Sequence, residues 1–443
     1  MSEPAQPTLR QVLTAPSLLK LLALSALLGV PVSLAAFWFV GFEHQLQHWV
    51  WESAPKQLGF SRAPWWWGLP ALALAGLLAA PIITRMRGAG GHTPVHGLGG
   101  PPTPPGDLPG VVLAALVCLP LGVMLGPEAP LMALGGGLAL LAVRSSRRSS
   151  RPQLTAVVGA AGSTAAISTI FGSPLVAAVM MIEAAGLGGV RLMVLILPCL
   201  LASGVGALVF TGFGHWTGLG IGSLALPQEP AAGLPDAGDF LWGIPLAALI
   251  GLLITAARAL GFLTEGWVHG SRPALRIVMC AVAVGACITL YALATDRSPE
   301  EAALSGQATL GQIAADPHSW AVTALLALVA FKLLGWGVAL GSLRGGPIFP
   351  AVMIGAALGV ACGGLPGLGM ASGLAAGISA ASTAVTRLPV TSVVLAAALL
   401  GKEANTLMPL LIISAVTALL TAVALDRPAP EAEPAPEPQR AHG

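Results

Sequence analysis

The feature that most constrains the fold is an almost unbroken apolar run over residues 119–143, LPLGVMLGPEAPLMALGGGLALLAV. It holds one ionisable side chain, Glu128, between two prolines. An acid inside hydrocarbon is costly and marks a functional site by default. Helices broken by Gly and Pro at membrane depth occur where the backbone lines a cavity. Glu128 is therefore the first candidate functional residue; the alternative is a neutral, hydrogen-bonded acid in a membrane-protein core.

The composition places the chain among integral membrane proteins. Of its 443 residues, 55% are hydrophobic and 9% are charged, whereas soluble domains carry about 25% charged residues. Apolar stretches recur from residue 18 to residue 425, and many are interrupted by Gly and Pro or exceed one crossing of about 20 residues. The sequence predicts an all-α multi-pass fold with several short, tilted or broken helices. A net charge of +2 is too small to indicate binding to a nucleic acid.

Basic residues gather in short polar loops, at Arg85 and Arg87, over 144–151, and at Arg272 and Arg276. Short loops rich in Lys and Arg face the cytoplasm. The N-terminus lacks the pattern of a cleaved signal peptide. We expect a multi-pass protein in the lipid bilayer of a cell membrane, with the bacterial inner membrane favoured.

Two patterns occur twice in the same order. The pattern G-P-x-x-P-x-x-x-x-G covers 126–135 and 346–355. The pattern A-A-G-x-x-A-A, followed by a proline, begins at Ala160 and again at Ala375. This duplication predicts two membrane repeats, with bounds that we set as follows: N-terminal polar tail 1–14, first repeat 15–215, linker 216–239, second repeat 240–425, and a disordered Pro/Glu-rich tail 426–443.

In both copies the Gly-Pro pair precedes an apolar run, so each loop should open a helix. The first amides of a helix have no intrahelical partner and carry partial positive charge, which favours an anion. A cation site would instead need carbonyl oxygens or several acids. Duplicated, broken membrane segments are typical of a transport site near the midplane. The residues thus predict anion transport.

The stretch 88–110 is rich in Gly and Pro and predicts a re-entrant loop or a linker. His92 and His96 would lie on one face of a helix, but Pro94 lies between them and no HExxH pattern is present. An intramembrane metalloenzyme using these histidines and Glu128 is the alternative from another functional class, although zinc needs three or four ligands. Glu183 ends an apolar run and is either functional or at the aqueous boundary.

Four stretches resemble motifs of the CLC family of chloride channels and proton-coupled chloride exchangers. Residues 126–130, GPEAP, resemble its G(K/R)EGP loop, and 346–350, GPIFP, resemble its GxFxP loop. Residues 171–177, FGSPLVA, resemble FNAPLAG, and 387–392, RLPVTS, resemble RAPLTG. The similarity runs from about residue 18 to residue 425, and the four motifs occur in the family's order.

This resemblance implies an inverted-repeat CLC-like fold and a homodimer with one pore in each subunit. Glu128 would be the gating glutamate, and the backbone amides of Ile348 and Phe349 would bind the anion. The transported ion would be chloride or a similar monovalent anion, possibly with protons, and fluoride is less favoured. The resemblance implies a transporter without enzymatic activity, cofactor or metal.

Three departures bear on mechanism. The family's GSGxP loop corresponds to 90–94, with Gly91 at the position of the anion-facing serine, where only His92 or Thr93 offers a substitute. Ala184 takes the place of the exchangers' inner proton glutamate, and Glu183, a possible proton-path residue, is one position away. The family's late tyrosine is missing. We therefore expect channel-like or loosely coupled flux, with strict chloride/proton antiport as the alternative.

The expected pore-loop residues are Gly90, His92, Thr93, Pro94, Gly126, Pro127, Gly346, Pro347 and Pro350.

The only tyrosine, Tyr291, lies in an earlier span. The inner end of the pore must therefore be built without a tyrosine hydroxyl from the last helix.

Overall fold

The computed structural model describes residues 16–98, 100–145, 152–217, 225–226, 230 and 233–426. The expected polar tail 1–14, the basic residues 146–151, half of the expected linker and nearly all of the tail 426–443 lie outside the described residues. Predictions that fall on those segments stay predictions.

The described residues are mostly helical, as predicted, and within them the only extended pairing is one isolated bridge between Gly126 and Gly346. The α-helices are α2 (Pro16–His48), α3 (Ala54–Gln57), α4 (Gly68–Arg85), α5 (Leu108–Cys118), α6 (Glu128–Ser145), α7 (Pro152–Phe171), α8 (Pro174–Ala185), α9 (Gly189–Thr217), α10 (Ala237–Val268), α11 (Pro273–Thr295), α12 (Gln307–Ala315), α13 (Val322–Ser342), α14 (Ile348–Cys362), α15 (Met370–Thr386), α16 (Pro389–Leu399) and α17 (Ala404–Leu425). Short 3-10 or π segments are η1 (Trp49–Ser53), η2 (Arg87–Gly90), η3 (Pro94–His96), η4 (Pro105–Asp107), η5 (Pro299–Glu301) and η6 (Pro317–Ser319).

In the described part of the chain, seven helical segments are long and apolar enough to cross a membrane. They are Pro16–Gln57, Gly68–Arg85, Arg191–Thr217, Ala237–Val268, Pro273–Thr295, Val322–Ser342 and Ala404–Leu425. Seven further apolar helices, among them α6, α8, α14 and α16, have only 10–17 residues in their apolar part. This mixture confirms the prediction of short, broken helices, because a fully spanning helix needs about 20 residues.

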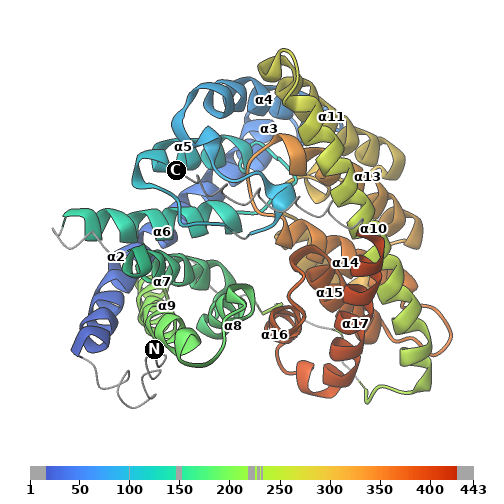
Figure 1. Ribbon diagram of the computed structural model, residues 1–443. Coiled ribbons are helices and arrows are strands. Elements are labelled where there is room, and N and C mark those ends of the chain that lie inside the picture. The colour runs from blue at the N-terminus through green and yellow to red at the C-terminus, as the bar shows by residue number, and fades with distance from the viewer. Residues whose placement is uncertain are drawn as a thin grey trace, which may run out of the picture.

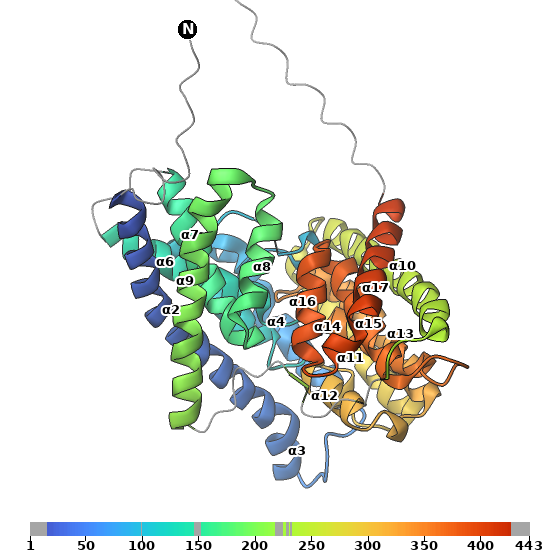
Figure 2. The same cartoon turned by 90° about the horizontal axis from the view of Figure 1, so that it is seen from below.

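The helices form two groups around the centre of the molecule (Figure 1). Helices α6 to α9 pack with α2 on one side, and α10 and α13 to α17 lie on the other, while α4 packs along α11. Helix α8 meets α16 where the groups face each other. In Figure 2, the start of α2 and the end of α17 point toward the same end of the molecule. One apolar core runs through both groups.

The repeated sequence patterns are the packing faces of two equivalent helix pairs. In the first pair, Gly135 of α6 lies against the backbone of Gly162 in α7. In the second, Gly355 of α14 lies against Gly377 of α15. A Cβ at either position would overlap the facing carbonyl oxygen. Small residues let membrane helices approach this closely, which explains why the same spacing recurs in both halves.

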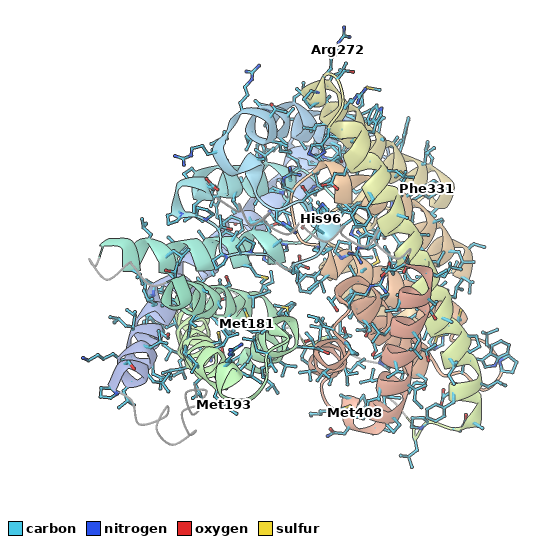
Figure 3. All side chains as sticks on the ribbon, in the orientation of Figure 1. His96, Met181, Met193, Arg272, Phe331 and Met408 are labelled. Carbon is cyan, nitrogen blue, oxygen red and sulfur yellow. The ribbon has the colours of Figure 1, made fainter. Side chains whose placement is uncertain are left out.

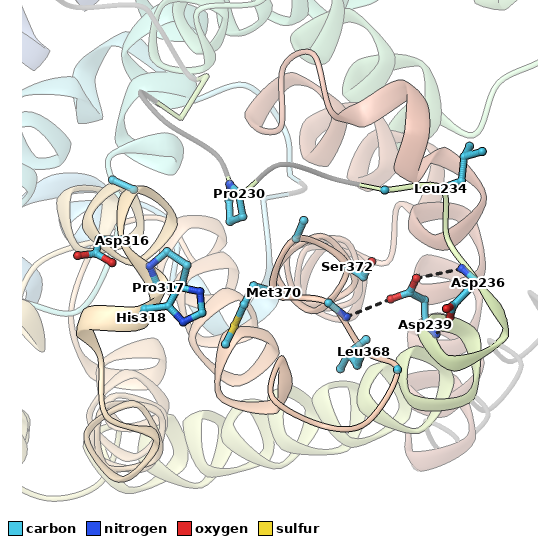
Figure 4. A pocket seen from close by; sticks show the side chains of 15 residues that line it. Pro230, Leu234, Asp236, Asp239, Asp316, Pro317, His318, Leu368, Met370 and Ser372 are labelled. Carbon is cyan, nitrogen blue, oxygen red and sulfur yellow. Dashed lines mark hydrogen bonds between the residues drawn. The ribbon is translucent and has the colours of Figure 1, made fainter.

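The second group of helices begins at a capped N-terminus. The Asp236 side chain accepts hydrogen bonds from the amides of Gly238, at 2.7 Å, and Asp239, at 3.2 Å. The Asp239 carboxylate bonds back to the Asp236 amide, at 3.0 Å, and also accepts from Gly369 at the start of α15, at 3.2 Å (Figure 4). These bonds fix the start of α10 close to the end of the expected linker. The division into repeats at 215 and 240 stays a prediction.

Candidate functional site

The two Gly-Pro loops meet through their backbones. The amide of Gly126 donates to the carbonyl of Gly346 at 2.7 Å, and the amide of Gly346 donates to the carbonyl of Gly126. These glycines hold the same position in the repeated pattern. Because Pro127 and Pro347 follow them directly, α6 and α14 both start beside this bridge. The anion-binding helix ends predicted from sequence therefore converge on one point.

Glu128 lies at this point with no exposed surface. It is the first residue of α6, and its Oε1 accepts a hydrogen bond from the Phe349 amide in the first turn of α14, at 2.8 Å. Its other carboxylate oxygen, Oε2, has no hydrogen-bond partner among the described residues. The carboxylate thus occupies the place at the α14 N-terminus where partial positive charge favours an anion.

Glycine is needed at both loop positions because the carboxylate fills the space beside them. A Cβ built at Gly126 or at Gly346 would overlap the Glu128 carboxyl group. Ile348 and Phe349, the predicted anion-binding positions, are the first two residues of α14, and both are buried. The Phe349 ring packs on Phe171 at the end of α7, with centroids 5.8 Å apart.

A cavity of about 770 Å³ lies beside this site. Its lining includes Gly90, Gly91 and His92 from the loop after α4, and also Ala129, Pro130, Met181, Ala184, Arg344 and Pro347. The cavity therefore reaches Ala129 and Pro130, which directly follow Glu128, and Pro347 of the facing loop. Thr93, Pro94 and Glu183 are not among its described lining residues, so of the two candidate substitutes for the missing serine only His92 faces it. Figure 3 shows the lining residue Met181 on α8, and it shows His96, which follows the lining loop, beside α10.

The loop before the cavity has an unusual backbone. Gly88, Ala89, Gly90 and Gly91 all have positive φ, at 71°, 47°, 72° and 103°. Residues other than glycine rarely adopt such φ angles. A Cβ at Gly91 would also lie 3.3 Å from the side chain of Val111. This chain thus lacks the family's serine at a position where the loop backbone would be strained by any residue with a side chain.

His92 lies in this loop, outside the membrane-spanning helices. Partial burial lowers the pKa of His92, and the nearby His96 and Arg344 lower it further, whereas Glu265 raises it. The lowered pKa favours the neutral form of the His92 ring. Arg344 and Asp107 are the charged side chains among the described residues that line the cavity.

Glu183 joins the two groups of helices. Its carboxylate accepts hydrogen bonds from the amides of Val390, at 3.0 Å, and Thr391, at 2.7 Å, and from the Thr391 hydroxyl, at 2.7 Å. These donors are in the first turn of α16. A carboxylate at this place accepts hydrogen bonds from amides that have no partner within the helix, and its negative charge is stabilised by the helix dipole. The adjacent Ala184 lines the cavity with a methyl group that cannot carry a proton.

Tyr291 belongs to a separate buried network. Its hydroxyl donates to Glu301 Oε2 at 2.5 Å, and the same oxygen accepts from Arg297 at 2.8 Å. Tyr291 is not among the described lining residues of the cavity. It therefore does not replace the missing tyrosine at the pore.

The metalloenzyme alternative finds no support in the described part of the chain. His96 pairs with Glu265 at 2.9 Å, and its ring lies 5.8 Å from that of His92. No group of three or more His, Cys, Asp or Glu side chains suited to a metal ion occurs among the described residues. Glu128 bonds instead to the Phe349 amide.

Sequence reasoning missed two buried cations. Lys332 in α13 is fully buried and donates to the carbonyls of Ala302, Ala303 and Leu304 at 3.0, 3.0 and 3.1 Å. Arg344 lies in the loop before Gly346 and is 7% exposed. Each is a single basic residue in an apolar stretch, a signal that marks intramembrane functional or structural sites.

Comparison with known proteins agrees with this geometry. The family model described as "Voltage gated chloride channel" matches residues 93–422. "Putative ion-transport protein YfeO" of Salmonella paratyphi A is 30% identical over 358 residues, covering 77% of this chain and 80% of that protein. The YfeO protein of Escherichia coli O1:K1 / APEC is 29% identical over 345 residues, covering 77% and 78%.

Solved structures share the fold. A slow cyanobacterial Cl⁻/H⁺ antiporter aligns with a TM-score of 0.73 and 17% identity over 91% of this chain and 94% of that one. A CLC-type fluoride/proton antiporter aligns with a TM-score of 0.67 and 19% identity over 91% and 95%. These TM-scores establish the shared all-α architecture. Because the sequence identities are low, the ions that those two proteins carry are not assigned to this chain.

Proposed function

Because the chain belongs to the voltage-gated chloride channel family, CLC, we propose that it carries a small monovalent anion, chloride first, past Glu128 across a cell membrane. The observation that carries this proposal is the hydrogen bond from the Phe349 amide to the Glu128 carboxylate. A helix N-terminus that holds a carboxylate has the donors to hold an inorganic anion in the same place.

Glu128 acts as the gate in this proposal. Its carboxylate and the transported anion compete for the α14 N-terminus, and both cannot occupy it. Protonation removes the negative charge and weakens the bond to the amide, since hydrogen bonds to charged groups are the stronger ones. The side chain then leaves the position and an anion enters. Flux should therefore rise as pH falls.

Two features favour channel-like or loosely proton-coupled flux. Ala184 lines the cavity where exchangers would carry an inner proton acid. Glu183, the nearest acid along the chain, is held by three donors of α16. The retained Glu128 is what supports the second candidate, strict chloride/proton antiport. In either mode the protein acts in the bilayer, and the expected homodimer with one pore in each subunit is part of the proposal.

Liposomes carrying the purified protein test the two modes. A chloride gradient is imposed, a potassium ionophore clamps the voltage, and chloride and proton movements are recorded, with a fluoride gradient in parallel. We expect chloride flux with little or no uphill proton movement. Glu128→Ala is the control, and it should conduct chloride without any response to pH.

The other outcomes are equally informative. Uphill proton pumping that Glu128→Ala abolishes would establish strict antiport and a proton route that avoids Ala184. Fluoride flux without chloride flux would change the substrate. The absence of any anion flux in the wild-type protein would refute the proposed function.

A further inference from the structure

Arg344 lines the cavity beside Glu128, and no described carboxylate forms an ion pair with it; Glu265 acts on its charge only from beyond ion-pair distance. Its side chain is 7% exposed, although it carries a permanent positive charge. Its Nε donates to the Ala89 carbonyl at 3.0 Å, and its Nη1 donates to the Leu343 carbonyl at 3.1 Å. Both partners are neutral carbonyls, so no charged group contacts the guanidinium directly.

The acids of the same region do not pair with this guanidinium. Among the described residues, no carboxylate lies within ion-pair distance of Arg344. Glu265 pairs with His96 instead, and Asp107 lines the cavity without reaching Arg344. A buried charge without a partner is expensive. An anion in the cavity would place a negative charge directly against this guanidinium, which no described side chain does.

The Arg344 guanidinium also has N–H donors that make no hydrogen bond to another described residue. Arginine has five N–H donors, and the bonds from Nε and Nη1 use two of them. No described hydrogen bond uses Nη2. The loop that carries Ala89 contributes Gly90 and Gly91 to the lining of the same cavity.

A purely structural role is the alternative. The two bonds to carbonyls do hold the loop after α4 against the loop before α14, across 255 residues of sequence. A neutral donor such as Gln could make bonds of that kind without burying a charge. The charge and the free donors are what the structural role leaves unexplained.

We propose that Arg344 is a binding site for one small inorganic monovalent anion in this cavity, supplying N–H donors where the chain lacks a serine hydroxyl at position 91. The site rests on the proposed transport function and adds a step to it. An anion that enters the cavity is held at Arg344 before it reaches the α14 N-terminus, when Glu128 leaves. The site and Glu128 thus bind anions in series.

Bromide tests the site without relying on transport. Crystals of the full chain grown with bromide should show anomalous density beside the Arg344 guanidinium in the wild-type protein and none there in Arg344→Gln. Arg344→Lys keeps the charge if Gln does not fold, and it should retain weaker density. Absence of the peak in the wild-type protein, or its persistence in Arg344→Gln, would overturn the proposal.

Flux provides the second readout. The concentration of chloride on the cavity side that gives half-maximal flux should rise about tenfold in Arg344→Gln, as expected for losing one charge-assisted hydrogen bond. Arg85→Gln removes an exposed positive charge near the same end and should leave this concentration unchanged. An equal rise in both variants would assign the effect to surface charge and contradict the site. Lack of wild-type flux would instead refute the transport function, whatever the bromide density shows.

Discussion

At the scale of single residues, the site depends on how little space surrounds one carboxylate. Gly126 and Gly346 leave room for the Glu128 carboxyl group, and a Cβ at either position would overlap it. The sequence predicted Glu128 because an acid in an apolar run is rare. It did not reveal Arg344, because that role depends on Ala89, which is distant in sequence and close only in the fold.

Gly346→Ala should force the Glu128 side chain out of its position. We expect a loss of stability of about 1–3 kcal/mol, the usual cost of overpacking, and anion flux with weaker pH dependence. The added Glu128→Ala change removes the clash, so the double variant should be more stable than the sum of the two single effects predicts. Thermal unfolding of the four proteins in detergent measures this coupling, and strict additivity would contradict the packing argument.

Gly91→Ser should not restore a missing anion ligand. The backbone at this position has φ of 103°, and a Cβ would lie 3.3 Å from Val111. We expect a loss of stability of about 1–3 kcal/mol from strain and no gain in anion affinity. Thermal unfolding and half-maximal flux measure the two effects. Tighter chloride binding in this variant would show that the loop can adopt the family's conformation after all.

At the scale of helices, the repeated patterns act through packing. Gly135→Leu should disrupt α6 on α7, and Gly355→Leu should disrupt α14 on α15 to a similar degree, because each glycine faces a backbone carbonyl. Gly188→Leu is the control, since no atom lies within 4 Å of a Cβ built there. We expect a clear fall in unfolding temperature for the first two variants only. A stable Gly135→Leu protein would contradict the equivalence of the two helix pairs.

Glu183 belongs to the same scale because it connects α8 to α16. Glu183→Ala leaves the amides of Val390 and Thr391 without their acceptor. A lost helix cap costs about 0.5–2 kcal/mol, so the unfolding temperature should fall. We expect Glu183→Gln to recover part of this loss and the pH dependence of flux to stay intact in both variants. Loss of pH dependence would show that Glu183 carries protons.

At the scale of the whole molecule, sequence reasoning reached the architecture because both of its signals are periodic. Apolar runs indicated the membrane fold, and the duplicated patterns located the paired loops. The bridge between Gly126 and Gly346 was beyond prediction, because no local pattern states that two loops from different halves pair through their backbones. The carbonyl cage around Lys332 was hidden for the same reason. Long-range contacts of this kind follow from the fold.

The central claim is that Glu128 and the anion compete for one helix N-terminus. The most direct measurement is chloride flux into liposomes as a function of pH for the wild-type protein and for Glu128→Gln, which keeps the side chain's size and removes its charge. Wild-type flux should rise as pH falls, by up to about tenfold for each pH unit if one proton opens the gate. Flux through Glu128→Gln should be high and independent of pH. Wild-type flux that ignores pH, or a Glu128→Gln protein that keeps the wild-type pH dependence, would contradict the account.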